Sequence, residues 1–119
     1  YKKTGIYPPM HCVAMRGEVY EANRWMAQSL MKAFEEARGY SAIAQMFDGH
    51  LRYALPFLHA AVEEHKEIFG DDDPWRYGVE ENRHTLETLV SYSHEQGLIP
   101  RRYDLAELFA EETWATSRN

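Results

Sequence analysis

The sequence lacks several features that would assign a class of protein at once. Its apolar stretches are all far shorter than the roughly 18 apolar residues that a membrane-spanning helix needs, so no membrane span is expected. It has one cysteine, Cys12, which excludes an internal disulfide and a cysteine-built metal site. Because Cys12 lies in an apolar run, we predict a buried thiol rather than a reactive one.

A basic stripe is also missing. The chain has 13 lysines and arginines against 19 aspartates and glutamates, and its formal net charge is −6. Nucleic acid is therefore not an expected partner, because binding to phosphates needs clustered basic residues. What is present, 45% hydrophobic residues including 13% aromatic ones, predicts a folded chain. Its 119 residues are enough for one domain and not for two.

The common motifs of enzyme sites are missing as well. The glycines form neither of the phosphate-binding patterns, GxxxxGK and GxGxxG, and no serine lies in a GxSxG turn. Two histidines share a helical face with a glutamate four residues away, in the pairs His59–Glu63 and Glu80–His84. Neither pair supplies the three or more ligands that a zinc site needs. No metal site and no cofactor are expected.

Residues 10–16 are the one segment that predicts a strand. This short apolar stretch follows the irregular residues 1–9 and ends at Gly17. A single strand cannot satisfy its own backbone hydrogen-bonding groups. It therefore needs a partner sheet outside this sequence or in a second copy, and we expect the isolated chain to self-associate.

The rest of the chain predicts helices. Asn23 is a plausible N-cap of the first helix, Gly97 closes the third, and Asp104 with Glu107 has the form of a capping box before the last. No signal divides residues 1–119 into domains. The expected fold is thus mostly α, one N-terminal strand followed by three to four helices, with the helices over residues 24–46, 55–69, 79–96 and 104–110.

Two stretches carry side chains suited to a small ligand. His11 follows the stiff Pro8-Pro9 pair at the start of the predicted strand, where it can pair with a carboxylate or move a proton. The alternative is a buried histidine that shapes the loop. In the second stretch, residues 73–78, the Arg76 guanidinium can bind a carboxylate, but burial of Trp75 as a structural plug explains this stretch more simply.

These stretches, with the residues after them, resemble the carboxy-terminal third of 4,5-dihydroxyphthalate decarboxylase-like proteins. The resemblance covers nearly the whole chain. It rests on a combination of short segments, at residues 6–11, 16, 19–23, 33–37, 75–80, 82–83, 85–87, 92, 95–98 and 107–110.

The resemblance implies a two-lobed α/β fold like that of type 2 periplasmic-binding proteins, with the ligand between the lobes. Residues 1–119 would then form the carboxy-terminal segment of one lobe, and the missing amino-terminal part of the parent chain would be its partner. The implied reaction is non-oxidative loss of carbon dioxide from an aromatic dicarboxylate such as 4,5-dihydroxyphthalate. His11 is the candidate catalytic residue, and His11 and Tyr7 are the candidate substrate-binding residues. Arg76 is not a candidate, because the family favours proline there.

Two other functions fit the same sequence. One is a ligand-binding segment of an ABC-type solute-binding protein for a small organic anion, since fold alone does not decide function. The other is a stand-alone helical interaction domain, which the unpaired strand disfavours. A decarboxylase would be cytoplasmic and a solute-binding protein periplasmic; the expected ligand in the first case is a small aromatic carboxylate.

Overall fold

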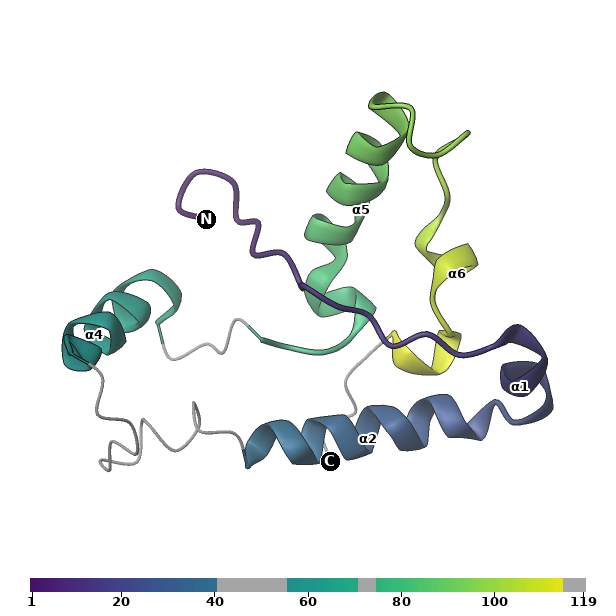
Figure 1. The fold of residues 1–119 in the computed structure, drawn as a ribbon, viewed down its shortest axis with the longest axis horizontal. Helices are drawn as coiled ribbons and strands as arrows, with labels where there is room; N and C mark the ends of the chain where they lie inside the picture. Colours follow the sequence, from purple (N-terminus) through teal and green to yellow (C-terminus); the bar gives the residue numbers. More distant parts are fainter. Residues whose placement is uncertain (41–55, 71–74, 115–119) are drawn as a thin grey trace. The chain divides into compact units, whose positions relative to one another are not determined.

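The computed structural model describes residues 1–40, 56–70 and 75–114. The chain divides into two compact units, one made of Tyr1–Met31 with Trp75–Asn119 and the other of Lys32–Pro74. All regular structure in the described residues is helical (Figure 1). The prediction of a mostly α chain is therefore confirmed. Among the same residues, no helix combines the length and the apolar character needed to cross a membrane.

The strand predicted over residues 10–16 is absent. These residues are described and have no regular structure, because the described residues contain no strand with which they could form a ladder of hydrogen bonds. Gly17 begins a helix instead of ending a strand. The apolar side chains of this segment face water: Met10 is 73% exposed and Val13 is 70% exposed. Cys12 is exposed too, so the prediction of a buried thiol is wrong.

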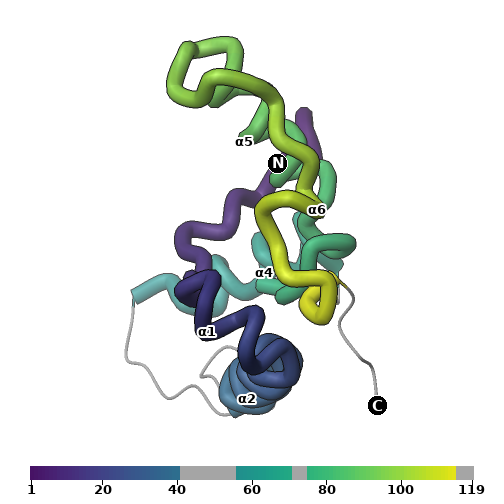
Figure 2. Tube along the Cα trace, turned by 90° about the vertical axis from the view of Figure 1, so that its right-hand side faces the viewer, coloured from purple at the N-terminus to yellow at the C-terminus, as the bar shows by residue number. Residues whose placement is uncertain are grey.

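Helices α1 (Gly17–Ala22) and α2 (Trp25–Gly39) follow one another with a sharp turn between them (Figure 2). Asn23 makes this turn. Its side-chain amide donates to the carbonyl of Val19 at 3.2 Å, and its own carbonyl accepts from the Met26 N–H at 2.9 Å. The amide thus caps the end of α1, whereas the sequence predicted Asn23 as an N-cap. The part of the predicted 24–46 helix beyond residue 40 lies outside the described residues.

Helix α5 (Val79–Glu95) is the longest helix described, and both of its ends have a local cause. It starts after Gly78, whose φ of 105° suits glycine alone. It ends in a Schellman motif: the Gly97 N–H donates to the His94 carbonyl at 3.0 Å, and the Leu98 N–H to the Ser93 carbonyl at 2.8 Å. The predicted helix over 79–96 and the role of Gly97 agree with this geometry.

After Gly97 the chain runs back beside α5 to the short helix α6 (Leu105–Leu108) and the 3-10 turn η1 (Glu111–Thr113) (Figure 1). The predicted capping box is present. The Asp104 carboxylate accepts from the Ala106 N–H at 3.1 Å, and the Glu107 carboxylate accepts from the Asp104 N–H at 2.9 Å. The helix predicted over 104–110 is therefore shorter than expected and is followed by a tighter turn.

The small core of the first unit lies between α5 and α6. Val79 (2% exposed), Leu86 (7%) and Leu105 (3%) are buried against one another. The Glu80 N–H also donates to the Trp114 carbonyl at 3.0 Å, which ties η1 to the start of α5. Leu89, three residues after Leu86 on α5, is exposed. Half-buried side chains complete the core: Val90, Phe109 and Trp114.

The second unit contains the end of α2 and helix α4 (Leu58–Phe69). Helix α4 starts two residues after Pro56, and Phe57 before it has a left-handed φ of 63°. Within α4, the rings of His65 and Phe69 contact each other at a centroid distance of 4.8 Å. At the end of α2, the Arg38 guanidinium binds the Glu35 carboxylate at 2.7 Å. Residue 55 of the predicted 55–69 helix lies outside the described residues.

Candidate functional site

The candidate residue Tyr7 lies on the lead-in segment, by which we mean residues 1–16 before α1. This segment begins with one tight turn. The Tyr1 carbonyl accepts from the N–H groups of Thr4 at 3.0 Å and Gly5 at 2.7 Å. Gly5 has a φ of 69°, which lets the chain leave the turn without strain. The Ile6 N–H then donates to the Thr4 hydroxyl at 3.2 Å. The turn is therefore held by its own backbone and by one side chain.

Tyr7 packs against Trp75, a residue far away in the sequence. Their rings meet edge to face, with centroids 4.9 Å apart and planes at 78°. This is a favourable arrangement for two aromatic rings. The sequence favoured Trp75 as a structural plug, and the contact agrees with that interpretation. It brings together the two stretches whose side chains the sequence analysis found suited to a small ligand.

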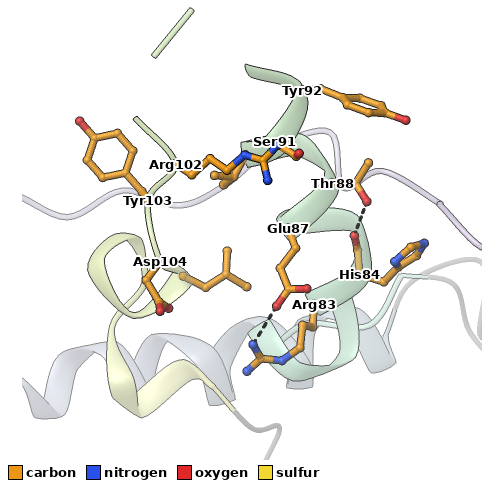
Figure 3. Close-up of a pocket in the computed structure, with 11 residues that line it drawn as sticks. Arg83, His84, Glu87, Thr88, Ser91, Tyr92, Arg102, Tyr103 and Asp104 are labelled. Carbon is orange, nitrogen blue, oxygen red and sulfur yellow. Dashed lines mark hydrogen bonds and ion pairs between the residues drawn. The ribbon is translucent and has the colours of Figure 1, made fainter. Parts of the chain in front are cut away.

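His84 on α5 makes the second contact to the lead-in segment. Its Nε2 lies 3.0 Å from the Thr4 carbonyl oxygen. A carbonyl oxygen only accepts, so Nε2 carries the hydrogen and donates it. Figure 3 shows the His84 ring projecting from α5 on the side away from Tyr103. The lead-in segment is thus attached to the second stretch and to α5 by two separate contacts.

His11, the candidate catalytic residue, lies beyond these contacts. Its side chain is exposed, and it makes no hydrogen bond or ion pair with the described residues. The alternative of a buried, hydrogen-bonded histidine therefore does not fit the described structure. Tyr7 and His11 are four residues apart on an extended backbone, and the structure brings Tyr7 but not His11 to Trp75.

The loop before α5 is fixed by Asn82. Its side-chain amide donates to the carbonyls of Arg76 at 2.8 Å and Gly78 at 2.9 Å. One amide thereby holds both sides of the turn that carries Trp75. Sequence reasoning gave Asn82 no role, although its spacing from Gly78 is the ordinary four residues of a helix.

An open hollow lies between α5 and residues 102–105 of the same unit. Its volume is about 620 Å³, which falls within the range of small-molecule sites. Figure 3 shows Arg102 reaching from the returning segment toward Ser91 on α5. The lining residues come from these two elements: Arg83, His84, Glu87, Thr88, Val90, Ser91, Tyr92, Arg102, Tyr103, Asp104 and Leu105.

The cations of this hollow are already paired. Arg83 binds Glu80 with its Nε at 3.0 Å and Glu87 with its Nη1 at 3.1 Å. The hydrogen bond from Arg83 lowers the pKa of Glu80 below its usual value. Arg102 binds Glu95 at 2.9 Å. Two guanidinium groups thus meet three carboxylates, so the hollow carries no net positive charge for an anion.

No cluster of three or more metal-ligating side chains occurs in residues 1–40, 56–70 and 75–114. Of the two histidine–glutamate pairs in the sequence, Glu80 is bound to Arg83 and His84 to the Thr4 carbonyl. His59 lies on α4, in the other unit.

Comparison with known proteins agrees with the resemblance found in the sequence. The chain is similar to a 4,5-dihydroxyphthalate decarboxylase of Comamonas testosteroni, with 29% identity over 109 residues, or 92% of this chain. The chain spans 33% of the length of that curated relative. No family model and no solved structure matches it.

Proposed function

We propose that this chain forms the carboxy-terminal segment of one lobe in a two-lobed decarboxylase similar to the Comamonas testosteroni protein. The proposed reaction is the non-oxidative loss of carbon dioxide from an aromatic dicarboxylate such as 4,5-dihydroxyphthalate. The observation that carries the proposal is the similarity along 92% of the chain. Because the chain spans 33% of that relative, the rest of the site would come from other residues of a longer protein.

The surface of the described residues supports a role as part of something larger. Only Ala27, Val79, Leu86 and Leu105 are buried hydrophobic residues in the part that the structure describes. A chain of this size ordinarily buries more. Large apolar side chains are exposed instead, at Met10, Val13, Trp25, Phe57, Leu89 and Leu98 among others. Their burial would follow from association with the rest of the proposed protein.

In the proposed reaction, the bond between the ring carbon and the leaving carboxylate breaks. Its electron pair stays on the ring carbon, which takes up one proton, and carbon dioxide leaves. A ring hydroxyl para to the leaving group favours protonation at that carbon, and a proton donor must reach it. His11 is the candidate donor, or the clamp for the retained carboxylate. The Tyr7 hydroxyl would hydrogen-bond to the substrate.

The lead-in segment suits these roles. His11 is exposed, so its imidazole is open to a ligand, and Pro8 and Pro9 stiffen the backbone between it and Tyr7. Tyr7 is half-buried against Trp75, which fixes its ring and lowers the entropy lost on binding. A rigid tyrosine and an accessible histidine on the same segment provide a hydrogen-bond donor and a proton carrier.

The test is a chimera. In the Comamonas testosteroni decarboxylase, the segment that this chain matches is replaced by the chain itself, and carbon dioxide release from 4,5-dihydroxyphthalate is measured. We expect the chimera to release carbon dioxide. In His11→Ala the rate should fall at least about 100-fold, which is the usual contribution of a general acid or base. The matched control is His59→Ala, an exposed histidine on α4, which should leave the rate unchanged.

Three outcomes separate the alternatives. A folded chimera that binds the substrate tightly without releasing carbon dioxide would favour the solute-binding alternative. Equal rates in His11→Ala and His59→Ala would remove His11 from the site. A chimera with native-like circular dichroism but neither binding nor release would contradict the proposed function. Self-association of the isolated chain belongs to the same proposal, and a monomer by light scattering would contradict that part.

A further inference from the structure

The turn at residues 1–5 is built so that it offers one carbonyl to α5. Hydrogen bonds to the Tyr1 carbonyl close the turn, and the Thr4 hydroxyl accepts from the Ile6 N–H. The carbonyl oxygen of Thr4 is left to face outward, where it accepts from His84 Nε2 at 3.0 Å. The contact joins residues 80 positions apart in the sequence. It therefore fixes the first residues of the lead-in segment against α5.

The second attachment lies three residues further along the segment, between Tyr7 and Trp75. A segment held at one point can pivot, whereas each further point of attachment restricts its direction. The Tyr7 ring sits at the second point, so its orientation depends on the first. His84 itself stands on α5, whose ends are fixed by Gly78 and the Schellman motif.

We propose that His84 is a positioning residue of the ligand site, which holds the lead-in segment through Thr4 and thereby sets the Tyr7 ring against Trp75. The ligand part of this inference rests on the proposed function, because Tyr7 is its candidate substrate-binding residue. The geometric part stands on the two contacts alone. Neither the spacing of the residues nor the similarity to the decarboxylase assigns His84 this role.

The geometric part is tested by nuclear magnetic resonance on the 119-residue chain. In the edge-to-face contact, the Trp75 ring current shifts the Tyr7 ring protons. In His84→Leu we expect at least half of this shift to be lost. In His84→Gln, whose amide can donate in place of Nε2, most of it should return. The control is His94→Leu, a second exposed histidine on α5, which should leave the shift unchanged.

The result that overturns this part is an unchanged Tyr7 shift in a folded His84→Leu variant, or an equal loss in the leucine and glutamine variants. If His84→Leu does not fold, the wild-type chain decides. Its His84 nitrogen shifts should report the tautomer with hydrogen on Nε2, and a predominant Nδ1–H tautomer would overturn the inference.

The ligand part is tested in the chimera by calorimetric titration with 4,5-dihydroxyphthalate. We expect His84→Leu to raise the Kd about fivefold or more, and His84→Gln to stay within about twofold of the unsubstituted chimera. An unchanged Kd in His84→Leu, while the unsubstituted chimera binds, would overturn the inference and leave the proposed function standing. No binding by the unsubstituted chimera would overturn the proposed function, while the resonance shifts still report on His84.

Discussion

Two regions of the first unit differ in how they satisfy their own backbone and apolar groups. From Val79 to Leu108, α5 and α6 bury three apolar side chains together, and the end of α5 and the start of α6 have local caps. Residues 6–16 have neither a core nor a ladder, and Met10 and Val13 face water. The first region has a small core and caps of its own, although Leu89 and Leu98 on it are exposed. The second is apolar and extended, which is the state of a segment that needs a partner.

The largest effect on stability is expected from truncating a side chain in the α5–α6 core. Leu86→Ala should lower the free energy of unfolding by about 2–3 kcal/mol, because a buried leucine leaves a cavity when it is truncated. Val13→Ala, an apolar truncation on the exposed segment, should change it by less than about 0.5 kcal/mol. Urea unfolding followed by circular dichroism measures both.

If the two regions differ as described, Leu86→Ala must lose much more free energy of unfolding than Val13→Ala. Comparable losses in Leu86→Ala and Val13→Ala would mean that Val13 is buried in solution, by a second copy or by residues outside the described part. A negligible loss in Leu86→Ala would mean that the α5–α6 core contributes little to stability.

A smaller effect is expected at the cap of α6. Asp104→Ala removes the acceptor for the Ala106 N–H, and we expect it to cost about 1 kcal/mol, the usual value of an N-cap. Asp104→Asn keeps an acceptor oxygen and should cost a few tenths of that. Thermal unfolding distinguishes the two variants. Equal losses in both would show that the charge of Asp104 matters more than its hydrogen bond.

These local devices explain how much of the fold the sequence could predict. The Asp104–Glu107 capping box and the end of α5 at Gly97 each depend on residues within one turn, and both were predicted. Asn23 was correctly placed at a helix boundary, but its amide caps α1 behind it instead of α2 ahead of it. Leu89 shares the helical spacing of the core residues and is exposed, because spacing does not say where neighbours lie.

The candidate site shows the limit of the same reasoning. Residues 10–16 have the composition of a strand, but a strand exists only where another segment pairs with it. The Tyr7–Trp75 and Thr4–His84 contacts join residues that no periodicity relates. The spacing of Glu80 and His84 suggested a pair on one helix face, whereas each binds a different partner. Sequence reasoning therefore found the two stretches but not the contact between them.

The smallest expected effect is the dependence on pH of the Glu107 ion pair. The Arg101 guanidinium, at 2.8 and 2.6 Å, and then the Asp104 N–H lower the pKa of Glu107 to about 2. An unfolded glutamate has a pKa near 4.3. As the pH falls, the unfolded chain is therefore protonated at Glu107 before the folded chain is. The stabilisation is therefore complete above about pH 4.5 and is lost as the pH falls toward 2.

Glu107→Gln isolates this contribution, because glutamine also serves in a capping box and removes only the charge. Between pH 6 and 2.5, wild type should lose slightly more stability than Glu107→Gln, measured as the difference in Tm. The pair is exposed, so 0.5 M salt should shrink that difference. Glu36→Gln, a substitution on the exposed side of α2, should follow wild type across the range. Parallel curves for wild type and Glu107→Gln would show that Arg101 and Glu107 are not paired in solution, and the start of α6 would then depend on its capping box without the ion pair.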